Sequence, residues 1–129
     1  MIVVRVRDEI ELIVPLELFA ANGQRHRIEF VVDSGFTGFL ALSPALVRQL
    51  GLASRGIQEG MLADGTAASI RLVIVSVIWD GTPRQIEAQI LGEPLIGTRM
   101  LRGCELRALF ESEGQVTIEQ SPRTDVATK

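Results

Sequence analysis

The stretch from residue 30 to residue 40 reads Phe30-Val31-Val32-Asp33-Ser34-Gly35-Phe36-Thr37-Gly38-Phe39-Leu40. Its first residues are apolar and favour a β-strand, and a second apolar run begins at Phe39. Between these runs the chain carries one carboxylate, Asp33, into a tight Ser-Gly turn. Because an unpaired charge is costly to bury, a carboxylate so close to two core strands needs polar partners. We therefore expect Asp33 to lie on a buried loop, in a structural or a catalytic role.

Asp-Ser-Gly alone is common turn chemistry, since Asp and Ser bond nearby backbone amides and Gly adopts positive φ. The whole pattern of apolar strand, Asp-Ser-Gly, Thr-Gly and second apolar strand resembles the active-site loop of the retropepsin-like aspartic peptidases. It is most similar to the small bacterial, single-lobe members, whose loop reads Asp-Thr-Gly-Phe-Thr-Gly. Ser34 stands where most members have Thr, and its hydroxyl preserves the capacity for the same hydrogen bond.

Length and composition indicate one globular domain. The chain has 129 residues, of which 47% are hydrophobic and 22% charged. Its net charge of -3 and pI near 5.2 argue against a polyanionic partner, so we expect no nucleic acid. The apolar run at the start is too short for a signal peptide and no stretch approaches a membrane span, which predicts a cytoplasmic protein without membrane contact. The resemblance implies a retropepsin-like aspartic peptidase domain over residues 1–120, which a polar tail follows over 121–129.

Turn signals divide the first half of the chain into strands and one helix. Strands are predicted at 2–7, at 10–19 and, after an Asn-Gly hairpin turn, at 25–32. Pro15 lacks an amide donor and therefore belongs at a strand edge or bulge. A short helix is predicted over 44–50, because Ser43 is a good N-cap and Gly51 can end the helix.

The region 57–70 has two moderately apolar arms around Asp64-Gly65, which predicts a second hairpin. Apolar residues fill both alternating sets over 70–79, so this strand should be covered on both faces. Asp80-Gly81 predicts a third hairpin turn with a return strand at 84–91. Asp64 and Asp80 both lie in Asp-Gly turns, and we nominate neither as a catalytic acid.

The second informative stretch is Leu95-Ile96-Gly97, followed by a short helical turn that ends near Gly103. It resembles the segment of two hydrophobic residues and a glycine that crosses beneath the acid loop in retropepsins, where the glycine allows close backbone approach. His26 has no partners at ligand spacing, so no metal site and no cofactor are predicted. Cys104 is the only cysteine and favours a small buried role over a nucleophilic one.

The resemblance implies an all-β fold, a closed single-lobe acid-protease barrel with one or two short helices. It implies that Asp33 is the catalytic carboxylate and that Ser34, Gly35, Thr37 and Gly38 complete the active-site loop. Asp64 and Gly65 would form the tip of a flap over bound peptide, and Ile96 and Gly97 would support the loop. Because the chain supplies one such Asp, an aspartic endopeptidase of this kind must be a homodimer that acts on a peptide or protein.

Two alternatives remain open from the sequence. The chain could be a dimeric β-barrel module that grips peptide strands without cleaving them. It could instead be an unrelated, monomeric barrel in which Asp-Ser-Gly is only a turn. Nothing in the sequence identifies a cleaved substrate.

Overall fold

The computed structural model describes residues 1–61 and 64–121. The predicted polar tail beyond Ser121 and residues 62–63 of the second hairpin lie outside the described residues. Over the described residues the chain forms ten strands and one helix, in the order β1 (Ile2–Arg7), β2 (Glu11–Phe19), β3 (Arg25–Val32), β4 (Leu40–Leu42), α1 (Pro44–Leu50), β5 (Ser54–Met61), β6 (Ala67–Trp79), β7 (Thr82–Ile90), β8 (Leu95–Ile96), β9 (Cys104–Ala108) and β10 (Gln115–Gln120).

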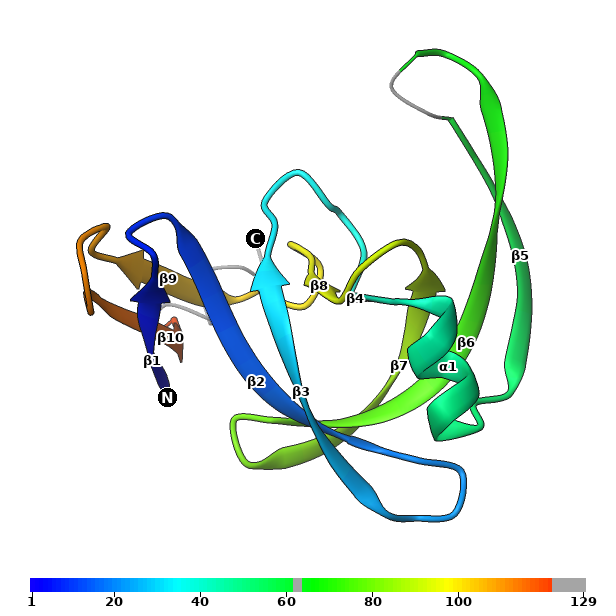
Figure 1. Cartoon of the computed structure of the whole chain (residues 1–129), viewed down its shortest axis with the longest axis horizontal. Helices are drawn as coiled ribbons and strands as arrows, with labels where there is room; N and C mark the ends of the chain where they lie inside the picture. Colours follow the sequence, from blue (N-terminus) through cyan, green and yellow to red (C-terminus); the bar gives the residue numbers. More distant parts are fainter. Residues whose placement is uncertain (62–63, 122–129) are drawn as a thin grey trace.

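The strands close into a barrel, as predicted. Neighbouring strands pair in the order β6-β7-β4-β8-β3-β2, and an additional pairing of β6 with β2 joins the two ends of this series. In Figure 1 the long, curved strands β2, β3, β6 and β7 wrap around the short strands β4 and β8. Because the series returns to its first strand, it leaves few open edges that could pair with another chain.

The predicted hairpin turns all form. Asn22-Gly23 joins β2 to β3, Asp64-Gly65 lies between β5 and β6, and Asp80-Gly81 joins β6 to β7. Each glycine has positive φ, which explains why glycine is favoured at these turns.

Pro15 occupies the position in β2 that can spare an amide donor. One edge of β2 pairs with β3 along its length, including Pro15 with Glu29. The other edge pairs with β1 at Glu11–Leu12 and with β6 at 17–19, so nothing pairs with Pro15 on that side. The proline therefore sits on a locally free edge, as its chemistry requires.

The core fills the inside of the barrel. Its buried members include Val14, Leu16, Leu18, Phe30, Leu40, Leu42, Val73, Val75, Val77, Ile86, Ala88 and Ile96. The prediction that 70–79 would be covered on both faces is correct only in part, because the alternate residues Ile74, Ser76 and Ile78 are half-buried. A barrel strand has one face covered by the interior, whereas its outer face needs a separate cover. It is the short strand β4 that is wholly buried.

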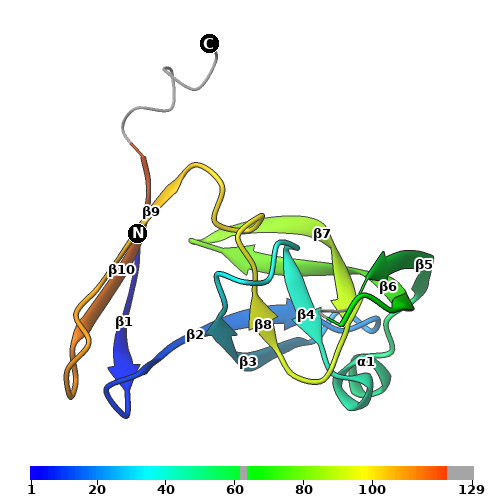
Figure 2. The ribbon, with the colours of Figure 1, turned by 90° about the horizontal axis from the view of Figure 1, so that it is seen from above.

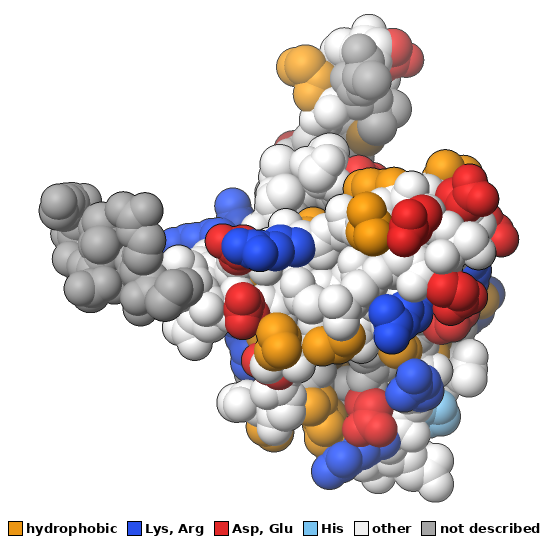
Figure 3. Space-filling model, turned by 90° about the vertical axis from the view of Figure 1, so that its left-hand side faces the viewer, with side chains coloured by type: hydrophobic (Ala, Val, Ile, Leu, Met, Phe, Trp, Pro, Cys, Tyr) orange, Lys and Arg blue, Asp and Glu red, His pale blue; other side chains and the backbone are white. Residues whose placement is uncertain are grey.

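The first and last parts of the described chain form a small sheet beside the barrel. β1 pairs with β10, and β10 pairs with β9, all antiparallel (Figures 1 and 2). This sheet and its turns leave several apolar side chains exposed: Met1, Val3, Leu106, Leu109 and Phe110. Figure 3 faces this side of the molecule and shows hydrophobic side chains interspersed with charges of both signs.

Helix α1 begins and ends where the sequence predicts. Ser43 is the N-cap, and its side chain accepts a hydrogen bond from the Leu46 amide at 3.2 Å. Gly51 ends the helix in the left-handed conformation with φ 65°. Leu46 and Leu50 join the core. No helix among the described residues is long and apolar enough to cross a membrane.

Replacing Ser43 tests how much this cap contributes. Ser43→Ala removes the acceptor of the Leu46 amide, so we expect the free energy of unfolding to fall by about 1 kcal/mol. Ser43→Thr keeps a hydroxyl and should recover most of the loss. Urea unfolding of the wild type and the two variants measures the difference. Equal unfolding midpoints for Ser43→Ala and the wild type would show that the cap does not contribute to stability.

Candidate active site

The Asp33 loop is held between strands that are distant in the sequence. β3 ends at Val32, one residue before Asp33, and its last residues pair in parallel with Leu95 and Ile96 of β8. On its other side β8 pairs antiparallel with Leu40 and Ala41 of β4. The short strand β8 therefore lies between the strand that enters the loop and the strand that leaves it.

Backbone hydrogen bonds fix both ends of the loop. The Asp33 amide donates to the Ile96 carbonyl at 3.0 Å, and the Gly97 amide donates to the Phe39 carbonyl at 2.9 Å. Further along the chain, the Thr98 amide donates to the Phe36 carbonyl at 2.9 Å, and the Arg99 amide donates to the Gly38 carbonyl at 3.2 Å. These bonds satisfy the loop's backbone and restrict where the Asp33 side chain can lie.

Gly97 packs directly under the loop. A Cβ atom added at this position would lie 2.8 Å from the Phe36 carbonyl oxygen and nearer still to the Gly38 carbonyl oxygen. Both contacts involve backbone that is already fixed by hydrogen bonds, so neither group can easily move. A side chain at residue 97 is therefore incompatible with this loop. After Gly97, the residues up to Gly103 form hydrogen-bonded turns, and no second helix is assigned there.

The Asp33 carboxylate has one partner within the described chain. Its Oδ1 accepts a hydrogen bond from the Gly35 amide at 2.8 Å, and the Phe36 amide donates to the Asp33 carbonyl at 3.1 Å. Asp33 itself is half-buried, while Ser34 and Gly35 are exposed. The expectation of a buried loop is therefore wrong for the single chain, because no element of the described chain covers the turn.

The next residues of the loop take different positions. Thr37 is exposed, whereas Gly38 is half-buried against the Phe36 ring and the Gln89 amide group. A Cβ atom on Gly38 would lie 2.6 Å from the Phe36 Cζ atom and 3.1 Å from the Gln89 Nε2 atom. Glycine at residue 38 thus lets the Phe36 ring fold back against the loop.

The β5–β6 hairpin projects from the barrel on the same side as the Asp33 loop (Figure 1). At its turn, Asp64 Oδ1 accepts hydrogen bonds from the Thr66 hydroxyl at 2.6 Å and from the Thr66 amide at 3.0 Å. These bonds stabilise the carboxylate and lower the pKa of Asp64, the hydroxyl contributing most. Gly65 has φ 87°, a conformation that other residues rarely adopt. Asp64 is therefore engaged in holding the turn.

Solved structures with a similar arrangement of strands identify the fold of this chain. A retropepsin-like aspartic protease from Rickettsia conorii superposes with a TM-score of 0.55 and 20% identity, over 92% of this chain and 97% of that one. The chain has the retropepsin-like fold. The protease of EIAV, in complex with the inhibitor HBY-793, matches 75% of this chain and 92% of its own, at 13% identity and a TM-score of 0.49. No family model and no curated protein sequence matches.

The retropepsin-like fold leaves a polar hollow beside the Asp33 loop. It has a volume of about 110 Å³ and is lined by Thr37, Gly38, Phe39, Gln58, Glu87, Gln89 and Arg99. The sequence pointed to Thr37 and Gly38 but not to the other lining residues. Phe39 belongs to the same loop, whereas the four other lining residues come from β5, β7 and the turn after β8. These four are scattered polar residues, which give no local signal of a shared site.

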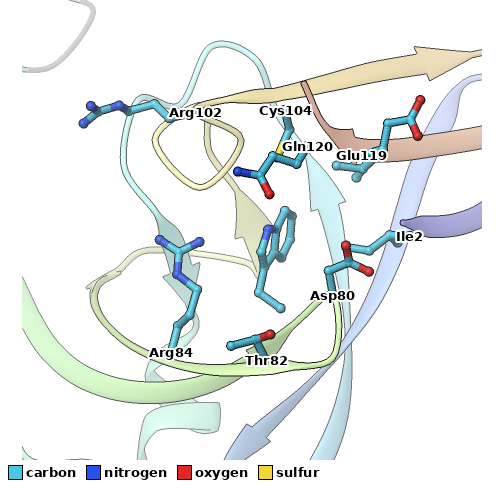
Figure 4. A pocket seen from close by; sticks show the side chains of 10 residues that line it. Ile2, Asp80, Thr82, Arg84, Arg102, Cys104, Glu119 and Gln120 are labelled. Atoms are coloured by element: carbon cyan, nitrogen blue, oxygen red, sulfur yellow. The ribbon is translucent and has the colours of Figure 1, made fainter. Parts of the chain in front are cut away.

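A larger hollow of about 250 Å³ lies near the β6–β7 turn. Figure 4 shows Arg84 and Arg102 on one side of it, and Asp80 and Glu119 on the other. Burial raises the pKa of the Cys104 thiol in its wall, and the nearby charge of Arg84 partly opposes this. None of its lining residues belongs to the Asp33 loop, so it is separate from the candidate active site of this retropepsin-like fold.

No group of three or more His, Cys, Asp or Glu side chains among residues 1–61 and 64–121 is placed to hold a metal ion.

Proposed function

We propose that this protein is an aspartic endopeptidase that acts as a homodimer, with one Asp33 from each subunit. The observation that carries the proposal is the setting of Asp33, which follows β3 in a loop fixed by β8 and by residues 97–99. The retropepsin-like fold, which the comparison covers over 92% of the chain, supports the same assignment.

The dimer follows from the chemistry of peptide hydrolysis. Hydrolysis without a metal or a nucleophilic side chain needs one group that accepts a proton from water and one that donates a proton to the substrate. Two carboxylates about 3 Å apart fill both roles, because like charges so close keep one proton between them. The chain has one Asp-Ser-Gly loop, so the second carboxylate must come from another subunit. The exposure of Ser34 and Gly35 leaves the turn free to meet its counterpart.

Each proton has an assigned path in this reaction. The ionised Asp33 accepts a proton from a water molecule while the oxygen of that water attacks the scissile carbonyl carbon. The protonated Asp33 of the other subunit donates its proton to the carbonyl oxygen. One hydroxyl group of the tetrahedral diol then gives its proton to the Asp33 that is now ionised. The Asp33 that took its proton from water protonates the nitrogen as the C–N bond breaks. The products are a carboxylic acid and an amine, and the pair of Asp33 side chains again holds one proton.

The remaining loop and hairpin residues have supporting roles in the proposal. The Ser34 hydroxyl would bond across the dimer axis, and Gly35 would let backbone approach the carboxylates and the water. Thr37 and Gly38 complete the loop, while Ile96 and Gly97 hold it from below. Gly65 would give the tip of the β5–β6 hairpin its mobility as a flap over a bound peptide, because glycine has no Cβ atom to restrict the backbone.

Cleavage of a diverse peptide mixture, read by mass spectrometry from pH 3 to pH 8, tests the proposal. We expect new peptide ends whose rate of appearance forms a bell in pH. The rate should fall at high pH when the shared proton is lost, and at low pH when both carboxylates are protonated. A folded dimer that cleaves no peptide would instead favour a module that only binds peptides, and a folded monomer would exclude an active site shared between two Asp33 carboxylates.

A further inference from the structure

We propose that the polar hollow beside the Asp33 loop is a side-chain subsite that selects an acidic residue in the bound peptide. This inference rests on the proposed function, because it names the class of substrate for the same cleft. The argument uses the position of the hollow, its size and the charges that line it.

The position of the hollow places it along the path of a bound peptide. Its wall combines Thr37, Gly38 and Phe39 of the Asp33 loop with Gln58 of the β5–β6 hairpin. It therefore touches both the catalytic loop and the element that would close over the substrate. An extended peptide directs alternate side chains to opposite faces, so a strand bound between these elements can place a side chain here.

The volume of the hollow limits its occupant to a single side chain. Its volume of about 110 Å³ is large enough for a few water molecules or one short side chain. Gly38 helps to keep this space open, because a Cβ atom there would lie 3.1 Å from the Gln89 Nε2 atom. A carboxylate side chain of Asp or Glu is of a suitable size.

The charges favour an acid over a base. The Arg99 guanidinium lies 5.9 Å from the centre of the Phe39 ring, within the range of a cation–π contact. It forms no ion pair with any residue that the structure describes. The other charged lining residue, Glu87, faces Arg55 at 3.9 Å. Arg99 is thus the charged lining residue of the hollow that has no ion-pair partner among the described residues.

The neutral lining groups reinforce this preference. The Thr37 hydroxyl and the Gln58 and Gln89 amides can donate hydrogen bonds to a carboxylate that Arg99 already attracts. An apolar side chain in the same place would displace water from these groups without replacing its hydrogen bonds. The hollow should therefore accept Glu or Asp best, Gln or Asn less well, and Leu poorly.

Profiling the cleavage sites of a peptide library tests the subsite. In the wild type we expect Glu or Asp to be enriched at one fixed position relative to the scissile bond, by about tenfold over Leu. Arg99→Gln should reduce this enrichment to less than about twofold while preferences at other positions stay the same. Arg99→Lys retains the charge and should restore much of the enrichment. The matched control is Arg102→Gln, an exposed arginine of the same turn that lines the other hollow.

The outcomes separate the subsite from the peptidase activity. Cleavage without acid enrichment, or enrichment that survives in Arg99→Gln, would overturn the subsite and leave the proposed function standing. If nothing is cleaved, the proposed function fails, and binding of fluorescent Glu, Gln and Leu versions of one library peptide decides the subsite. Tighter binding of the Glu version that Arg99→Gln abolishes would support it, and equal or absent binding would overturn it.

Discussion

Asp33→Asn is expected to abolish peptide cleavage, with a fall in rate of about a thousandfold or more. The amide is close to the carboxylate in size, and its oxygen can still accept the Gly35 amide hydrogen bond that holds the loop. What it lacks is the ability to take a proton from water and return it. In a homodimer the substitution changes both members of the dyad at once, so no intact acid–base pair remains.

The control for this prediction is Asp8→Asn. Asp8 lies in the β1–β2 turn, where it is exposed and has φ 54°, a conformation that Asn also accepts. The variant makes the same chemical change outside the loop and should cleave at the wild-type rate. Assays of initial rate, with thermal unfolding to confirm that both variants are folded, make the comparison. An Asp33→Asn protein that still cleaves near the wild-type rate would exclude Asp33 as the catalytic group.

Gly97→Ala should destabilise the fold by about 3 kcal/mol or more, a large part of the stability of an ordinary domain. The added methyl group would overlap the Phe36 and Gly38 carbonyl oxygens, which are anchored by the Thr98 and Arg99 amides. Relief requires the loop and β8 to move apart, which lengthens the hydrogen bonds that fix Asp33. We therefore expect a lower unfolding midpoint in urea and reduced cleavage by any protein that still folds.

Gly92→Ala is the matched control for this substitution. Gly92 lies in the turn between β7 and β8, its φ is not positive, and a Cβ atom there would have no neighbour within 4 Å. The same addition of one methyl group should leave stability within about 0.5 kcal/mol or raise it slightly. Equal stability of the Gly97→Ala and wild-type proteins would contradict the close approach beneath the loop.

Much of the fold could be predicted because its signals are local. Asn22-Gly23 and Asp80-Gly81 define hairpins within a few residues of themselves, and Ser43 with Gly51 defines the ends of α1. The pairing of β1 with β10 joins segments more than a hundred residues apart, and no short sequence pattern predicts this pairing. The half-buried alternate residues of β6 were also missed, since an apolar side chain does not reveal whether anything covers it.

The candidate site divides in the same way. The turn at Asp33 and the glycine at residue 97 could be recognised from short motifs and their order. The exposure of the Asp33 turn could not be predicted, because burial depends on what packs against the turn. Gln58, Glu87 and Arg99 meet only through the arrangement of β5, β7 and the turn after β8, so their sequence spacing carries no sign of a common hollow.

Mixing wild-type protein with Asp33→Asn protein tests the central claim most directly, because it asks whether two Asp33 carboxylates act together. The subunits are allowed to exchange at a fixed total concentration, and the rate of cleavage is measured against the fraction of wild-type chain. If both carboxylates are needed, the rate follows the square of that fraction and falls to about one quarter in an equal mixture. A linear decline, with about half the rate in an equal mixture, would show that each chain acts alone and would contradict the shared active site.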